Sequence, residues 1–356
     1  MLSAIDAARE SVCLEIYIYS AGALGLRFRD ALTKAARRGV GVRVLVDAGG
    51  SLGLPDDFWS PLRAVGGEAR FFNPIALRRF GIRNHRKLLA CDDRVAFVGG
   101  FNIAPEYEGD GVTRGWCDLG LRVEGALVGE LVASFNEMFA RAEFRHKGLA
   151  RLRRAELKRT VGHAGRQLLL SGPGRGPNPM LHALRTGLRH AQNVQIMVAY
   201  FLPPLGLRRD LARVARRGGA AQLILPGKSD VAMSQLAGQS LYRRLLKAGV
   251  EISEYEPQIL HAKLFVVDDV VYVGSSNLDP RSLHINYEFM LRIENVQMAA
   301  EAREIFSARL LNCGVVAEEA WRSRSVWTRF KQRWAHFLLA RIDPYIARRQ
   351  WRALPD

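Results

Sequence analysis

The alternation of apolar and polar stretches along the chain predicts strands and helices in a repeating order. A strand-like run at 12–19 is followed by an amphipathic segment that begins Leu-Gly-Leu-Arg and ends Arg-Arg-Gly, and then by a second strand-like run at 42–46. The same order recurs around the runs at 194–200 and 222–225. Strand, helix and strand at this spacing indicate βαβ units and a largely parallel sheet in each half of the chain.

Two further strand-like runs, at 88–91 and 264–267, each end at a pair of aspartates that begins with Asp92 or Asp268. Acidic pairs after a strand are typical of hairpin turns, in which a carboxylate accepts backbone N–H groups. The local pattern therefore favours a structural role for both aspartates.

The length of 356 residues and an apolar content of 48% are enough for two domains with cores of their own. The four cysteines are isolated, without a C-x-x-C pair, so we interpret them as buried free thiols. The predicted parts are a first domain at 1–142, a basic linker at 143–167, a second domain at 168–314 and a basic amphipathic tail at 315–356.

One motif, H-x-K-x4-D followed by a Gly-rich turn and an Asn, occurs twice, and its two histidines lie 176 residues apart. The first copy runs from His85 to Asn102 and the second from His261 to Asn277. The chain holds only eight histidines, so two chance matches are improbable, although a single match would be weak. Facing domains related by a pseudo-two-fold axis would bring both copies to one cleft.

The residue types in each copy favour the chemistry of phosphate esters. A His beside Lys and Asn is a poor metal set, because Lys has no acceptor, but it is a good phosphate set. One neutral imidazole can attack phosphorus while the other, protonated, donates to the leaving oxygen. The amines of Lys87 and Lys263 and the amides of Asn102 and Asn277 would stabilise negative charge in the transition state, so we expect no metal or other cofactor.

Each histidine also needs a group that fixes its tautomer. Asp118 and Glu288 lie on strand-like segments at comparable places after the two Gly-rich turns. We therefore expect Asp118 to hydrogen-bond His85 and Glu288 to hydrogen-bond His261.

At these residues the chain resembles the phospholipase D superfamily, whose signature is a duplicated His-Lys-Asp motif. The surrounding residues are similar to the bacterial cardiolipin synthase branch, in its shorter type without N-terminal membrane helices. The segments that carry this resemblance are 84–87, 99–107, 171–174 and 274–282. The resemblance covers nearly the whole chain and implies an α/β fold of two similar phospholipase D-like α/β/α sandwich domains, followed by the helical tail.

The resemblance also implies a phosphohistidine mechanism with a covalent phosphatidyl-enzyme intermediate. The family usually attacks with the histidine of the first motif, which assigns nucleophilic attack to His85 and the acid, then base, role to His261; the reverse assignment stays open. Asp92 and Asp268 complete the motif and join the catalytic set by resemblance. The family usually carries a further strand and loop ahead of the segment that here forms residues 2–9, which we expect to be the first helix of the repeat.

The net charge of +17 favours an anionic partner, either nucleic acid or an anionic membrane, unless it serves solubility alone. Aromatic and basic residues alternate in the tail, and one predicted helical face gathers Trp327, Phe330, Trp334, Phe337 and Leu338. Such a face suits the headgroup boundary of an anionic bilayer, while a helix packed on the body with a solvated basic face is an equal alternative. No stretch approaches 18 uninterrupted apolar residues, so we expect a peripheral protein on the cytoplasmic side of the bacterial membrane.

Together these features predict a phosphatidyltransferase with the activity of a cardiolipin synthase. The expected substrates are phospholipids such as phosphatidylglycerol and phosphatidylethanolamine, with the glycerol hydroxyl of phosphatidylglycerol as the acceptor. A phospholipase D hydrolase and a phosphodiesterase nuclease would use the same histidines and stay open as alternatives, although nucleic acid is the less favoured partner. A lipid-binding protein with silent chemistry is disfavoured because neither motif has lost a position.

Overall fold

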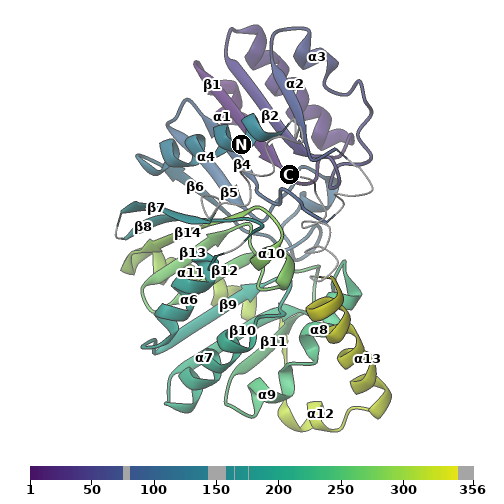
Figure 1. The fold of residues 1–356 in the computed structure, drawn as a ribbon, viewed down its shortest axis with the longest axis vertical. Coiled ribbons are helices and arrows are strands. Elements are labelled where there is room, and N and C mark those ends of the chain that lie inside the picture. Colours follow the sequence, from purple (N-terminus) through teal and green to yellow (C-terminus); the bar gives the residue numbers. More distant parts are fainter. Residues whose placement is uncertain (75–80, 143–157, 164, 175, 344–356) are drawn as a thin grey trace.

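The computed structural model describes residues 1–74, 81–142, 158–163, 165–174 and 176–343, and these form two α/β domains (Figure 1). The described residues from 158 onward form the second domain and the tail. The second domain lies below the first in Figure 1. The helices and strands of the first domain are α1 (Leu2–Ala7), β1 (Ser11–Ile16), α2 (Ala23–Arg37), β2 (Gly41–Asp47), α3 (Ser60–Arg63), β3 (Glu68–Phe72), β4 (Leu88–Cys91), β5 (Val95–Gly99), η1 (Pro105–Tyr107), β6 (Gly120–Glu124) and α4 (Leu127–Arg141).

The second domain and the tail follow the same plan with additions at both edges. Their elements are β7 (Arg159–His163), β8 (Arg166–Ser171), α6 (Pro179–Leu188), β9 (Asn193–Val198), α7 (Leu205–Arg216), β10 (Ala220–Pro226), α8 (Ala232–Gln239), α9 (Tyr242–Leu246), β11 (Glu251–Tyr255), β12 (Lys263–Val267), β13 (Val270–Gly274), α10 (Pro280–His284), β14 (Glu288–Glu294), α11 (Val296–Leu310), β15 (Cys313–Val315), α12 (Glu318–Arg322), α13 (Val326–Phe337) and the π-helical η4 (Leu338–Ile342).

The strand order shows the duplication directly. The first sheet has the order β3-β2-β1-β4-β5-β6, and the second contains the matching order β11-β10-β9-β12-β13-β14, extended by β15 at one edge and by β8 and β7 at the other. The repeat of two similar domains is thereby confirmed, as is the predicted first helix, α1.

The sheets are mixed, so the prediction of largely parallel sheets is wrong. The strands β1, β2 and β3 pair in parallel, but β4, β5 and β6 pair antiparallel, and the second sheet repeats this arrangement. The βαβ units account for the parallel part. The hairpins at Asp92 and Asp268, which the acidic pairs do predict, join β4 to β5 and β12 to β13. The strands β4 and β12 already run antiparallel to β1 and β9, which lie beside them in the sheets.

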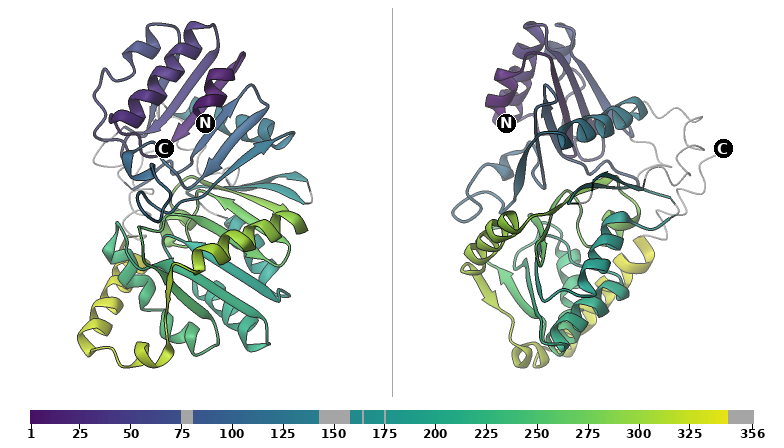
Figure 2. Two further views of the ribbon diagram at one scale, coloured as in Figure 1. Left: turned by 180° about the vertical axis from the view of Figure 1, so that it is seen from behind. Right: turned by 90° about the vertical axis from the view of Figure 1, so that its left-hand side faces the viewer.

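Helices cover both faces of each sheet (Figure 2). On the first sheet, one apolar cluster joins α1 and α2 to the strands, and another, on the opposite face, joins them to α4. That second cluster also takes in Leu168, Leu170 and Phe289 from β8 and β14, so the two domains share a continuous apolar core. A shared core holds the domains in a fixed relation, which a site built from both of them requires.

The predicted linker at 143–167 overlaps the second sheet. Strand β7 pairs with β8, so the sheet already begins at Arg159, and residues 143–157 lie outside the described residues. All four cysteines are free thiols, as expected. Three of them are buried, as also expected, but Cys313 is only half-buried, so the prediction of burial is wrong at that position.

In the tail, α13 packs on α8 through its least aromatic side. Gln332 and Ala335 are buried there, whereas Trp327, Phe330, Trp334 and Phe337 are 64%, 51%, 47% and 54% exposed. Residues 344–356 of the predicted tail lie outside the described residues. Within the described part of the chain, no helix has both the length and the apolar character that crossing a bilayer requires.

Candidate active site

The two motif histidines line one cavity of about 410 Å³ between the domains. His85 comes from the segment before β4 and His261 from the matching segment before β12, and both side chains are buried apart from the cavity face. Asn102 and Asn277 line the same cavity, as the duplicated motif predicts. The structure therefore joins two half-sites, one from each domain, in a single space.

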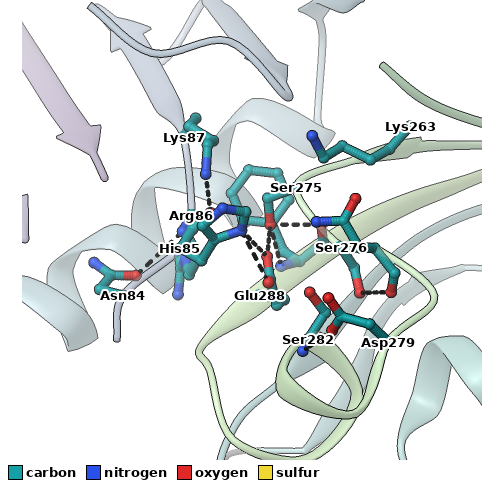
Figure 3. A network of polar contacts seen from close by, with 12 residues as sticks. Asn84, His85, Arg86, Lys87, Lys263, Ser275, Ser276, Asp279, Ser282 and Glu288 are labelled. Atoms are coloured by element: carbon teal, nitrogen blue, oxygen red, sulfur yellow. Dashed lines mark hydrogen bonds and ion pairs between the residues drawn. The ribbon is translucent and has the colours of Figure 1, made fainter. Parts of the chain in front are cut away.

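Each histidine is held by a carboxylate from the other domain, so the predicted pairing within each domain is wrong. Nδ1 of His85 lies 2.9 Å and 3.1 Å from the carboxylate oxygens of Glu288 (Figure 3). Nδ1 of His261 lies 2.7 Å from Oδ2 of Asp118. The two acids are the residues that the sequence singles out, but their partners are exchanged.

Two short parallel bridges between the domains cause this exchange. The backbone N–H of His85 donates to the carbonyl of Tyr287, the residue before Glu288. In the same way, the N–H of His261 donates to the carbonyl of Cys117, the residue before Asp118. Each bridge thus sets a histidine directly beside the acid of the opposite domain.

The two lysines lie beneath the cavity rather than on its wall. Both are fully buried; Lys87 directly precedes β4 of the first domain, and Lys263 is the first residue of β12 in the second (Figure 3). Nζ of Lys87 donates to the carbonyl of His85 over 2.7 Å, and Nζ of Lys263 donates to the carbonyl of His261. The ammonium of Lys263 also lies 2.9 Å from Nδ1 and 3.3 Å from Nε2 of His261. Because the contact of Nδ1 with Asp118 is shorter than its contact with Lys263, we infer that Nδ1 of His261 carries a proton and donates it in a hydrogen bond to Asp118.

The electrostatic surroundings distinguish the two histidines. Burial, followed by Lys87, Lys263 and His261, lowers the pKa of His85 well below its usual value. Burial and Lys263 also lower the pKa of His261, but Asp118 opposes them and raises it. His85 is therefore held neutral, and His261 keeps more of its affinity for a proton.

The carboxylate of Glu288 is itself perturbed. Burial raises the pKa of Glu288 to about 8, although Lys87 and a hydrogen bond from Ser275 act in the opposite direction. Oγ of Ser275 donates to Oε2 of Glu288 over 2.5 Å. The matching residue in the first motif is Gly100, where a Cβ would collide with Oδ1 of Asp118. The two half-sites thus differ at this position, and only Glu288 receives a hydroxyl donor from it.

A comparison with protein families matches residues 1–141 and 184–310 to the family described as cardiolipin synthase, PLD-like domain. The chain belongs to this cardiolipin synthase family. Its relatives include the major cardiolipin synthase ClsA of Bacillus subtilis, 32% identical over 93% of this chain and 70% of the relative. Cardiolipin synthase B of Salmonella typhimurium is 32% identical over 95% of this chain and 84% of its own length.

Solved structures show the same fold at lower identity. The crystal structure of phosphatidylserine synthase from Haemophilus influenzae Rd KW20 matches with a TM-score of 0.76 at 16% identity, over 97% of this chain and 91% of that one. Polyphosphate kinase from Porphyromonas gingivalis matches with a TM-score of 0.56 at 14% identity, over 87% of this chain and 47% of that one. These matches concern the fold alone.

The motif aspartates of this cardiolipin synthase family member lie away from the cavity. Asp92 follows β4 with φ of 55° and accepts backbone N–H groups of Arg9, Glu10 and Ser11. Asp268 follows β12 with φ of 47° and accepts the N–H groups of Gln192 and Asn193. Aspartate tolerates this left-handed conformation and bonds neighbouring backbone. The structure thus places both aspartates outside the cavity, in the structural position that the acidic pairs favour.

Aromatic side chains that the sequence analysis did not assign to the site pack against the histidines. Tyr17 meets His85 edge-on with ring centroids 4.8 Å apart, and Tyr107 and Trp116 lie 5.4 Å from His261. Tyr107 also accepts a hydrogen bond from Nδ2 of Asn102 over 2.8 Å. The signal that could have found Tyr107 is its place five residues after Asn102, since a short turn returns to the same cavity.

A buried polar network supports the first motif and was also missed. Arg86 pairs with Glu15 at 3.1 Å, and Nδ2 of Asn84 donates to the same carboxylate over 2.7 Å. Glu15 is the second-last residue of the apolar strand β1, and a lone acid in such a strand is the available signal. Among the residues that the structure describes, no group of three or more His, Cys, Asp or Glu side chains is placed to hold a metal ion.

Proposed function

We propose that this protein is a phosphatidyltransferase that forms cardiolipin from two phospholipids. The observation that carries the proposal is the pair of histidines from opposite domains on one cavity, each with Nδ1 occupied by a carboxylate. Nε2 of each ring is then the nitrogen left to meet phosphorus or a proton. Membership of the cardiolipin synthase family supports this transfer over other phosphate chemistry.

In the first half-reaction, the neutral Nε2 of His85 attacks the phosphorus of a donor phospholipid. A P–N bond forms, the P–O bond to the headgroup breaks, and His261 gives its proton to the departing oxygen. The lowered pKa of His85 suits the nucleophile, and the support of Asp118 for a protonated His261 suits the acid. Lys87 and Lys263 lie beneath the cavity, where their positive charge stabilises the negative charge that develops on the phosphoryl oxygens.

In the second half-reaction, a hydroxyl of the glycerol headgroup of phosphatidylglycerol gives its proton to His261 and attacks phosphorus. The P–N bond breaks, cardiolipin leaves, and both histidines return to their starting states. The amide of Asn277 lines the cavity, and its Oδ1 has no hydrogen-bond partner among the described residues, so it is available to a hydroxyl group of the substrate.

The test is lipid mass spectrometry on a bacterium that lacks its own cardiolipin synthases and expresses this chain. We expect cardiolipin to accumulate, and we expect a matched strain with His85→Asn to show no change. Phosphatidic acid in place of cardiolipin would instead show a hydrolase. Degradation of single-stranded DNA by the purified protein, without any lipid change, would show a nuclease.

We also propose that the protein acts at the cytoplasmic side of the bacterial membrane, as a peripheral protein docked through α13. The helix presents four exposed aromatic side chains, its opposite face packs on α8, and Leu339 just beyond it lines the cavity. Apolar insertion at the headgroup boundary, with about 1 kcal/mol from each nearby Lys or Arg, suffices to hold a peripheral protein.

Replacing Trp327, Phe330 and Trp334 with Ser is therefore expected to release the protein from vesicles of anionic lipid. All three side chains are about half exposed or more, so the fold should keep its unfolding temperature within a few degrees. Vesicle co-sedimentation and thermal unfolding measure the two effects. Leu311→Ser is the matched control, because Leu311 is an apolar side chain 89% exposed outside α13. Unchanged vesicle binding, or loss of the fold, in the triple variant would contradict docking through this face.

A further inference from the structure

Arg281 places a cationic group on the cavity wall from outside the two motifs. Arg281 stands in the first turn of α10, which follows the second motif, and it lines the cavity together with both histidines. Its guanidinium is 41% exposed and holds the carboxylate of Asp343 through two bonds of 2.8 Å, from Nε to Oδ2 and from Nη2 to Oδ1. Its third nitrogen, Nη1, lies 3.5 Å from the carbonyl oxygen of Gly81.

The carboxylate partner belongs to the tail rather than to either domain. Asp343 directly follows η4, and η4 continues α13, the helix that presents the exposed aromatic face. The other arginine on the cavity wall, Arg83, lies 3.9 Å from Asp47, a fully buried residue of β2. Arg83 is therefore fixed within its own domain, whereas Arg281 is occupied by a segment that lies on the surface.

A fork of two parallel bonds is also the geometry in which Arg binds a phosphate. A carboxylate in that fork stands in for a phosphate oxygen pair. Transfer to phosphatidylglycerol brings a second phosphodiester into the cavity, because the attacking hydroxyl is only three carbons from the acceptor's own phosphate oxygen. The two lysines and two histidines already serve the reacting phosphate, so the second phosphate requires a cation of its own.

We propose that Arg281 binds the phosphate of the acceptor phospholipid and that Asp343 occupies this subsite until the lipid displaces it. The inference rests on the proposed transferase function and adds the site that recognises its second substrate. Asp343 lies on the same run of helix as the aromatic face, so membrane docking and release of Arg281 involve one segment.

The test compares acceptor kinetics in Arg281→Gln, Asp343→Asn and the double variant, with a labelled donor in vesicles of defined phosphatidylglycerol content. Loss of the fork is expected to raise the KM for phosphatidylglycerol about tenfold in Arg281→Gln, with a smaller change in kcat. Asp343→Asn removes the competitor and is expected to lower that KM about threefold. The double variant should match Arg281→Gln alone, because Asp343 acts only through Arg281.

Glu294→Gln is the matched control, since Glu294 pairs with Arg292 at 3.1 Å on β14, away from this cavity, and its KM should equal that of the parent. If the ion pair only anchors the tail, Arg281→Gln and Asp343→Asn should change KM in the same direction and lower the unfolding temperature alike. That result would overturn the proposal. An unchanged KM in Asp343→Asn would overturn it as well. If the parent protein forms no cardiolipin at all, the proposed function fails first and the acceptor subsite fails with it.

Discussion

His85→Asn is expected to lose turnover by on the order of 10⁴-fold or more, because the covalent step loses the nucleophile assigned to it. His85 lies on the cavity, and burial together with three neighbouring cationic groups lowers its pKa, so its imidazole is neutral, as a nucleophile requires. Asparagine has similar size and polarity but no nucleophilic nitrogen. Steady-state transfer of labelled phosphatidyl groups measures the loss, with His190→Asn, an exposed histidine, as the control.

His261→Asn should lose a similar factor with natural lipids but behave differently with an activated donor. A phosphatidyl ester of p-nitrophenol needs no proton to leave, so His85 can still form the P–N bond. The second half-reaction then lacks its base, and the covalent intermediate should accumulate. Mass spectrometry after digestion at alkaline pH, where phosphohistidine survives, should find the phosphatidyl group on the peptide that contains His85. An adduct on His261 in the His85→Asn variant would reverse the two roles.

The sequence was sufficient to predict the duplicated α/β domains and most of the cavity. The motif contains the chemistry, and the repeated strand, helix and strand order places each copy in its own domain. The acidic pairs at Asp92 and Asp268 predicted the hairpins correctly. The antiparallel pairing of β4 with β1 and of β12 with β9 was missed, because the acidic pairs predict only the hairpin that follows each of β4 and β12.

The sequence could not predict which acid meets which histidine. Asp118 and Glu288 occupy equivalent places in the two repeats, so spacing within one repeat treats the local and the crossed pairing alike. The choice is made by the backbone hydrogen bonds from His85 to Tyr287 and from His261 to Cys117, which form only when the domains meet. The contact of Arg281 with Asp343 was hidden for the same reason, since 62 residues separate the two side chains.

The crossed pairing has a kinetic consequence that separates the two acids. Glu288→Gln and Asp118→Asn should each lower overall transfer by on the order of 10²–10⁴-fold, as loss of an orienting carboxylate does in other histidine sites. With the p-nitrophenyl donor, however, only the attack of His85 limits the first burst of p-nitrophenol. Glu288→Gln should therefore slow the burst, although Glu288 belongs to the second domain. Asp118→Asn should leave the burst nearly intact and slow the later turnover that depends on His261.

The dependence of the burst on pH tests the same pair from another side. Burial raises the pKa of Glu288 to about 8, so below that pH the carboxyl is protonated and its O–H donates to Nδ1 of His85. The ring proton of His85 then sits on Nε2, the nitrogen that must attack. As the pH rises through about 8, Glu288 ionises, the proton moves to Nδ1, and the burst rate should rise. Stopped-flow measurement from pH 6 to 9 should show this rise in the parent and in Asp118→Asn but not in Glu288→Gln. A rise that persists in Glu288→Gln and vanishes in Asp118→Asn would mean that each histidine is served by the acid of its own domain.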